Sequence, residues 1–301
     1  MAVALASDGS EVAWRRALAG GSVFDQEDHL PQGPYVFAYS AICDVPIETL
    51  DLLTGLLHHH RTAYDARPHQ RAGTARTQAK LLLRWYRDAA RIADLARDFR
   101  LSQATTYRYL HEGIDVLAAH APDLHEALSQ AQDDGLAYLT LDGTLISTDR
   151  LAERTEAGNH AWYSGKHKRF GGNVQVIADP TGFPIWTSPV EPGSTHDITA
   201  ARAHCLGALY PVAAAGLPTL ADKGYQGAGI GVRTPIKGSN RGVDNRAYNA
   251  LLTGMRAIGE RANALLTQRW TALRHVTLSP SRIGAIVAGA LVLTTLERGT
   301  R

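Results

Sequence analysis

The sequence has little of several features that would define a specialised class of protein. Cys43 and Cys205 are its only cysteines. Two isolated thiols cannot build a disulfide framework or a cysteine zinc site, and they fit a reducing compartment. Glycine and threonine interrupt the longest apolar run, residues 283–296, which is too short to span a bilayer. The first residues also lack the basic leader of a signal peptide. We therefore expect a soluble cytoplasmic protein with a buried C-terminal helix and no membrane partner.

A strong net charge is also missing. Lys and Arg number 31 against 29 Asp and Glu, so the formal net charge of +2 does not by itself indicate nucleic acid. The distribution is less even, because eight basic residues between positions 61 and 91 face only two acidic ones. A second, smaller basic cluster comprises Lys166, His167, Lys168 and Arg169. Either cluster is an ordinary solvated surface or a contact for phosphate groups.

What is present suggests a globular protein of two or three domains, since 45% of the 301 residues are hydrophobic. Glycine and proline punctuate residues 1–45, which we interpret as an arm. Residues 46–120 have a helical pattern, and residues 121–134 read as a polar connector that marks a domain boundary. Strand-like segments follow, and residues 130–298 are predicted to form the second domain.

The first domain carries a helix-turn-helix pattern. Apolar spacing predicts helices near residues 47–59, 77–86 and 92–99, and Ser102 is a natural N-cap for a further helix reaching residue 117. A short helix, a tight turn and a longer helix are typical of DNA-binding helix-turn-helix units. In that interpretation the second helix presents Gln103, Thr105, Thr106 and Arg108 to DNA. A plain pair of packed helices would give the same pattern.

The second domain reads as an α/β fold. Strands are predicted at residues 136–141, 145–147, 174–178, 183–188 and 218–221, with a short apolar segment at 232–236. Residues 179–182, Asp-Pro-Thr-Gly, form a turn that makes a hairpin of the third and fourth strands. Helices are expected at 200–209, 247–273 and 281–296. Antiparallel strands followed by a strand between helices indicate a mixed sheet of the ribonuclease H kind.

Acidic residues stand where predicted strands stop. Asp142 follows the first strand, and Asp197 ends the loop after the hairpin. Carboxylates that converge there repel each other unless a cation neutralises them, and oxygen ligands favour Mg²⁺ or Mn²⁺. Each acid has an alternative role: Asp142 and Asp222 as turn formers, Asp197 as a helix N-cap, and Glu260 as the surface partner of Arg256.

The chain resembles the transposases of bacterial insertion sequences in the DDE endonuclease superfamily. The resemblance is carried by residues 141–144 (LDGT), 163–197, 221–227 (ADKGYQG) and 256–270, and by the helix-turn-helix before them. It implies an RNase H-like catalytic domain preceded by an all-α helix-turn-helix domain. Asp142, Asp197 and Glu260 match the three catalytic, metal-binding acids of the family. Asp222 matches a further recurrent Asp and is an alternative third metal ligand.

The implied chemistry is hydrolysis of a phosphodiester followed by strand transfer, with two Mg²⁺ or Mn²⁺ ions held about 3.5–4 Å apart by carboxylates. The resemblance implies double-stranded DNA, as transposon ends and target, and a homo-oligomer on that DNA. His196 beside Asp197 is a candidate for proton transfer or for a structural hydrogen bond. Candidates for gripping the phosphate backbone are Lys166, Lys168, Arg169, Lys223, Lys237 and Arg256.

Two positions depart from the family pattern. Many relatives have a Tyr three residues before the Arg and a Lys seven residues after the Glu, where this chain has Thr253 and Thr267. The missing Lys would contact transposon-end DNA, and Arg269 or Arg274 is a possible substitute. Two other functions stay open: a decayed or domesticated transposase that only binds DNA, and a metal phosphohydrolase of small molecules. The second leaves the helix-turn-helix and the basic clusters unexplained.

Overall fold

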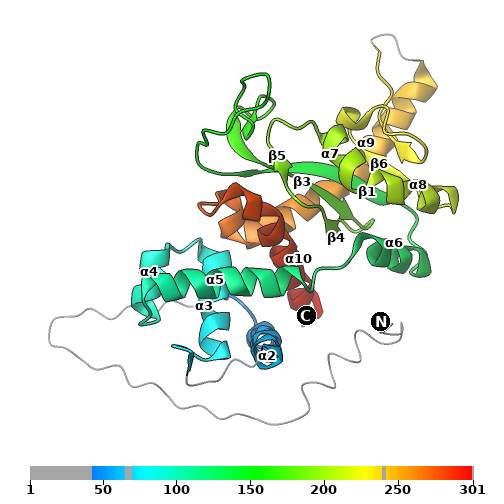
Figure 1. Ribbon diagram of the computed structural model, residues 1–301. Coiled ribbons are helices and arrows are strands. Elements are labelled where there is room, and N and C mark those ends of the chain that lie inside the picture. Colours follow the sequence, from blue (N-terminus) through cyan, green and yellow to red (C-terminus); the bar gives the residue numbers. More distant parts are fainter. Residues whose placement is uncertain (1–42, 65–69, 239–241, 300–301) are drawn as a thin grey trace, which may run out of the picture. The chain divides into compact units, whose positions relative to one another are not determined.

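The computed structural model describes residues 43–64, 70–238 and 242–299 (Figure 1). Nearly all of the predicted arm, residues 1–45, therefore lies outside the described residues. The helices and strands of the described part follow the order expected from the sequence, helices first and a mixed sheet second. Whether residues 46–120 and 130–298 are separate domains stays a prediction.

Four helices make up the first part. They are α2 (Ile47–Ala63), α3 (Ala75–Asp88), α4 (Ile92–Asp98) and α5 (Gln103–Ala118). The predicted N-cap is confirmed, because the backbone N–H of Thr105 donates to Oγ of Ser102 at 3.1 Å. Residues 99–102 form the turn between α4 and α5, where Arg100 adopts a positive φ of 52°. A DNA-binding role for this pair of helices remains a prediction.

Residues 121–134 are not a polar connector, and that prediction was wrong. They contain helix α6 (Leu124–Asp133), which begins where Asp123 caps the N–H of His125 at 2.8 Å. Leu124, Ala127, Leu128 and Ala131 are buried at helical spacing. The buried side chains join a core with α8 and the sheet, so this segment is part of the packed fold.

A mixed sheet forms the second part (Figure 1). Its strands are β1 (Leu139–Ser147), β2 (Tyr163–Ser164), β3 (Arg169–Ala178), β4 (Pro184–Thr187), β5 (Glu191–Pro192), β6 (Thr219–Ala221) and β7 (Val232–Arg233). The order is β2-β3-β1-β6-β7, and β4 and β5 also pair with β3. The central strand β1 is antiparallel to β3 and parallel to β6. This mixed α/β arrangement is consistent with an RNase H-like domain.

The predicted hairpin is confirmed, with β3 and β4 antiparallel and joined by residues 179–183, which include the predicted turn at 179–182. Asp179 shapes the turn, because its Oδ1 accepts from the backbone N–H groups of Thr181 and Phe183, while Gly182 takes a φ of 77°. The first strand differs from its prediction. We expected two short strands broken at Asp142, but β1 runs unbroken from Leu139 to Ser147 and pairs with β3 from Thr140 to Ser147.

Helices from the second half flank the sheet. They are α7 (Asp197–His204), α8 (Leu206–Ala214), α9 (Val243–Arg269) and α10 (Ile283–Gly299). Alternate residues of β1 point to opposite faces. Leu139 and Leu141 join the core made with α6, α7 and α8, whereas Ile146 joins a larger core with α9 and α10.

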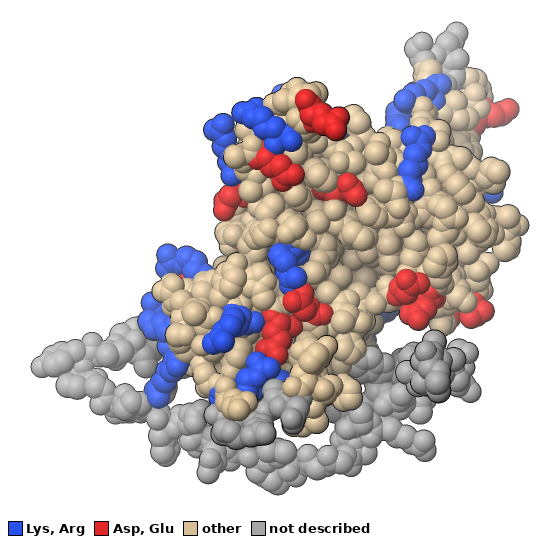
Figure 2. Space-filling view, viewed as in Figure 1, with Lys and Arg blue, Asp and Glu red and all other residues tan. Residues whose placement is uncertain are grey.

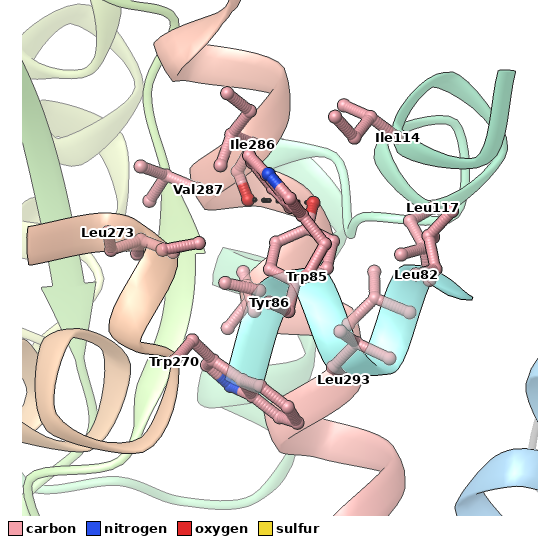
Figure 3. Close-up of a cluster of buried hydrophobic side chains, with 14 of the residues drawn as sticks. Leu82, Trp85, Tyr86, Ile114, Leu117, Trp270, Leu273, Ile286, Val287 and Leu293 are labelled. Carbon is pink, nitrogen blue, oxygen red and sulfur yellow. Dashed lines mark hydrogen bonds between the residues drawn. The ribbon is translucent and has the colours of Figure 1, made fainter. Parts of the chain in front are cut away.

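The larger core links segments distant in sequence (Figure 3). Tyr86 of α3 is fully buried, and its hydroxyl donates to the carbonyl of Ile286 in α10. Trp270 packs edge-on against Tyr86, and its indole N–H donates to Thr294 at 2.8 Å. Among the described residues, one helical stretch, Pro280–Gly299, is long and apolar enough to cross a membrane. Packing inside the protein explains the apolar composition of this stretch, because 61% of it is buried in the fold.

Candidate active site

Two acids lie side by side on neighbouring parallel strands. The register of β1 and β6 pairs Leu141 with Ala221. Asp142 and Asp222 each follow one of these paired residues, so the sheet carries both carboxylates at the same level. Asp142 lies in the middle of β1 rather than at its end, but the pairing with β6 stops there. Asp222 caps a short turn, because its Oδ1 accepts from the N–H of Gly224 at 2.7 Å. Its negative charge raises the pKa of Asp142.

A third acid, Asp197, approaches β1 at the residue after Asp142, because position 143 is glycine. A Cβ on Gly143 would lie 2.5 Å from Oδ1 of Asp197 and 3.0 Å from Nε2 of Gln175. Any larger residue would push the Asp197 carboxylate away from β1. Asp197 is the first residue of α7, whose N-cap is His196. The alternative role predicted for Asp197, as the N-cap of this helix, is therefore not observed. Its carboxylate instead binds side chains near β1.

Buried polar side chains of β3 hold the Asp197 carboxylate in place. Nδ2 of Asn173 donates to Oδ1 of Asp197 at 2.8 Å and to the carbonyl of Thr195 at 3.0 Å. Nε2 of Gln175 donates to Oδ1 of Asn173 at 2.9 Å, and the hydroxyl of Tyr225 donates to Oε1 of Gln175 at 2.6 Å. Gln175 and Tyr225 are fully buried. A satisfied polar chain of this kind fixes the orientation of the group at its end.

The electrostatics of the site favour a cation. Burial, and after it the charges of Asp222 and Asp197, raise the pKa of Asp142 to about 6, against the opposing charges of Arg256 and Lys166. Nζ of Lys166 lies 2.8 Å from Oδ2 of Asp197. Although burial lowers the pKa of Lys166, its bond to Asp197 and the other acids outweigh that effect and leave the pKa raised. The acids thus attract a positive charge.

Helix α9 crosses β1 and brings its own polar groups. A Cβ on Gly259 would lie 2.6 Å from Oγ1 of Thr140, so the helix approaches the strand closely there. One turn further on, Nδ2 of Asn263 donates to Oδ2 of Asp142 at 3.0 Å. Oδ1 of the same amide is buried and has no hydrogen-bond partner among the described residues.

The predicted third acid, Glu260, lies on the same helix but in a different setting. It is exposed and makes no hydrogen bond or ion pair with any described residue. Instead it lines an open groove of about 660 Å³ together with Asp222, Lys223 and Arg256. Its alternative role as the ion-pair partner of Arg256 is therefore not observed.

The donor set is suited to a hard divalent cation. The carboxylate of Asp142, the two carboxylates whose charges raise its pKa, and a buried amide oxygen without a partner among the described residues are the oxygen ligands that Mg²⁺ and Mn²⁺ prefer. Within residues 43–64, 70–238 and 242–299, however, no three His, Cys, Asp or Glu side chains already stand close enough to hold a metal ion. The residues fit a metal chemically, and the binding geometry is not preformed by acids alone.

Basic residues surround the acids unevenly. Lys166 pairs with Asp197, Lys223 shares the groove with Asp222, and Arg256 lies close enough to lower the pKa of Asp142. Lys168, Arg169 and Lys237 are exposed, and within the described part of the chain no contact joins them to an acid. Figure 2 shows acidic and basic groups mixed over the visible face, with Lys and Arg gathered at the upper left over the loop between β1 and β3.

The predicted DNA-reading residues of α5 divide into two groups. Gln103 and Arg108 are exposed and Thr105 is half-buried, so all three can be reached from solvent. Thr106 is fully buried, and its hydroxyl has no partner among the described residues. A side chain without exposed area cannot contact a base or a phosphate, so the prediction for Thr106 was wrong.

Several site residues could not be singled out from the sequence. Asn173 and Gln175 alternate in the otherwise apolar segment 173–178, and this period of two is the one signal that places both on the face of Gly143. Tyr225 lies in the motif at 221–227 but was given no role. Asn263 gave no signal beyond its position one turn after Glu260.

The comparison with known families agrees with this geometry. A family model described as DDE superfamily endonuclease matches residues 141–295, which is about half of the chain. The match begins at β1, immediately before Asp142, and ends within α10. It therefore contains every acid of the candidate site. No curated protein and no solved structure matches the chain.

Proposed function

The chain belongs to the DDE superfamily of endonucleases, whose members act on DNA as transposase-like nucleases, and we propose that it is the transposase of a bacterial insertion sequence. The proposal rests on one observation above all. Asp142 and Asp222 directly follow the paired residues Leu141 and Ala221 of neighbouring strands, and burial together with the charges of Asp222 and Asp197 raises the pKa of Asp142. Such an arrangement stores repulsion that a divalent cation relieves.

In this proposal Asp142 and Asp197 hold the metal ions, with Asp222 or Glu260 as the further acid. When bound, divalent cations supply the positive charge that activates the attacking oxygen and stabilises the leaving one. The protein's own contribution is to orient the carboxylates. Asn173 fixes Asp197 by a 2.8 Å hydrogen bond, and Gly143 leaves the space in which that carboxylate lies. Preorganised ligands of this kind need little rearrangement during the reaction.

We further propose that Lys166, Lys168, Arg169, Lys223, Lys237 and Arg256 grip the phosphates of transposon-end DNA. Arg108, Gln103 and Thr105 of α5 would read the ends, because all three can be reached from solvent. Strand transfer, assembly as a homo-oligomer on paired ends, and a cytoplasmic location on the nucleoid belong to the same proposal. Because Thr267 stands where relatives have a Lys that contacts transposon-end DNA, Arg269 or Arg274 would make that contact in this chain.

Nicking of supercoiled plasmid that carries the DNA flanking the gene tests the proposal. Wild-type protein should nick it with Mg²⁺ or Mn²⁺ and not with EDTA. Asp142→Asn and Asp197→Asn should lose more than about 100-fold of the activity while still binding the DNA, and the Asp222→Asn and Glu260→Gln variants identify the further acid. Asp133→Asn, an exposed acid of α6, is the matched control and should cut normally.

Two results would contradict the proposal. Binding of the flanking DNA without cleavage under any metal would favour a domesticated transposase that acts only as a DNA-binding protein. The exposed position of Glu260 and the absence of a preformed acidic metal cluster among the described residues are the observations that keep this alternative in view. Full cleavage by the Asp142 variant would refute the assignment of the active site itself.

A further inference from the structure

Helix α9 brings several polar residues near the acids, and among the described residues Asn263 is the one of them that hydrogen-bonds an acid of the site. Nδ2 of Asn263 donates to Oδ2 of Asp142 at 3.0 Å. Glu260, one turn earlier, is exposed and makes no hydrogen bond or ion pair with any described residue. The close approach of Gly259 to Thr140 fixes the rotation of the helix at this point. The packing of α9 on β1 therefore sets the directions of the Glu260 and Asn263 side chains.

Asn263 also has an oxygen that the fold leaves unused. Its Oδ1 is buried and has no partner among the described residues. A buried amide oxygen without a hydrogen bond costs about 1–3 kcal/mol, and such groups are rare in folded proteins. An amide oxygen beside a carboxylate is, however, a good ligand for Mg²⁺ or Mn²⁺. The unused acceptor gains a ligand if the amide turns and presents this oxygen to a cation held by Asp142.

We propose that Asn263 completes the metal site of Asp142, as the residue of α9 that binds the cation with its amide oxygen. Without metal, the amide presents its N–H₂ group to Asp142 and restrains the carboxylate. With metal, the same side chain offers Oδ1, because a half-turn of the terminal amide exchanges its two ends. The inference rests on the proposed function, since it assumes that Asp142 is a metal ligand.

The chemistry explains why an amide suits this position. Asp142 already feels two like charges, from Asp222 and Asp197. A third carboxylate in contact with it would raise the cost of ionising Asp142 further. A neutral amide supplies a hard oxygen without that repulsion, and it supplies a hydrogen-bond donor when no metal is present. Glu260 then remains free to act at the groove that it lines with Asp222 and Arg256.

Titration of the full-length protein with Mn²⁺, followed by the electron paramagnetic resonance signal of free Mn²⁺, tests this inference without requiring cleavage. Asn263→Leu, which keeps the size and removes both polar atoms, should weaken Mn²⁺ binding at least about 10-fold. Asn263→Asp, which keeps an oxygen at the same place, should bind within about threefold of the wild type. Gln268→Leu, which removes an exposed amide from the same helix, should bind normally.

Thermal unfolding of the same variants separates metal binding from structure. Added Mn²⁺ should raise the Tm of the wild type and of Asn263→Asp, but not that of Asn263→Leu. If Asn263→Leu binds Mn²⁺ as the wild type does, the inference is overturned, whatever its stability. Mn²⁺ binding by Asn263→Asp that is no tighter than binding by Asn263→Leu overturns it as well, because an oxygen at this position would then contribute nothing to the metal site.

Asp142→Asn distinguishes failure of the inference from failure of the proposed function. Loss of Mn²⁺ binding in Asp142→Asn together with normal binding in Asn263→Leu would leave the metal site standing and remove Asn263 from it. Normal binding in Asp142→Asn, or no binding by the wild type, would remove the proposed metal site and the inference with it.

Discussion

Replacing Asp142 by Asn should stabilise the folded protein at neutral pH in the absence of metal. Folding raises the pKa of this carboxyl from 3.8 to about 6, through burial first and the charges of Asp222 and Asp197 next. One pKa unit corresponds to about 1.36 kcal/mol. Ionised Asp142 therefore lowers the free energy of unfolding by about 3 kcal/mol. Asparagine has a similar shape and no charge, so the variant avoids this cost.

Part of the gain is lost with a hydrogen bond. Asp142 accepts from the N–H of Gly143 on Oδ1 and from Asn263 on Oδ2, whereas an amide offers a single acceptor oxygen. Losing one such bond costs about 1 kcal/mol, which leaves a net gain of about 2 kcal/mol. For a chain of this size, about 1 kcal/mol shifts the Tm by roughly 2–4 °C, so the expected rise is roughly 4–8 °C.

The pH dependence gives the sign of the effect. Because the folded-state pKa lies above the unfolded value, the cost is absent below about pH 3.8, grows as the pH rises, and is complete above about pH 6. Chemical denaturation from about pH 4 to about pH 7.5 should show the two proteins diverging as the pH increases. Saturating Mg²⁺ should close the gap at the upper end of this range by stabilising the wild type alone. A stability difference that stays constant over the whole range would refute the electrostatic explanation.

Three further predictions concern other parts of the molecule. Gly259→Ala should lower the free energy of unfolding by about 1–3 kcal/mol, because the added Cβ would clash with Thr140 of β1. Gly254→Ala, at a position of the same helix that is open to solvent, should raise it by about 0.5–1 kcal/mol. Equal effects of the two variants in urea unfolding would contradict this. Arg108→Ala should weaken binding of terminal-repeat DNA and reduce the slope of log K against log salt by about 1. Thr106→Val should leave DNA affinity unchanged and raise the free energy of unfolding by about 1 kcal/mol, since the lost hydroxyl has no partner among the described residues. Loss of DNA affinity in Thr106→Val, with none in Arg108→Ala, would restore Thr106 as a DNA contact. Lys166→Met removes a positive charge that lowers the pKa of Asp142, so the acid limb of the pH–rate profile for metal-dependent cleavage should move to higher pH. A shift of this limb to lower pH would exclude this role for Lys166.

Elements with strong local signals were predicted well. The N-cap at Ser102 and the Asp-Pro-Thr-Gly turn each depend on residues close in sequence, and both are confirmed. Helix α6 was missed because alanine supplies two of its four buried positions and polar residues surround them. Strand β1 was divided at Asp142 and Gly143 because both are typical of turns. Pairing with β3 from Thr140 to Ser147, on both sides of these two residues, overrides that preference.

The site was predictable only where a motif carried it. Asp142 and Asp197 were singled out from their motifs and from the resemblance, but neither their approach nor the pKa of Asp142 follows from sequence spacing. The approach of Asp197 depends on the space left by Gly143, and the pKa of Asp142 depends on its burial and on the charge of Asp222. Asn263 lies 121 residues from its partner Asp142. A hydrogen bond over that separation has no local sequence signal, so only the folded chain reveals it.

The burial of α10 between early and late parts of the chain also constrains the order of synthesis. Tyr86 makes its hydrogen bond to a residue 200 positions later, and α5 packs against the same helix. A ribosome adds about 5–20 residues per second, so this separation corresponds to a delay on the order of 10–40 s. During that interval the apolar faces of α3 and α5 have no α10 to cover them. A newly made chain therefore acquires its largest core only when residues 283–293 emerge, and a premature stop before them leaves chains that are prone to aggregate.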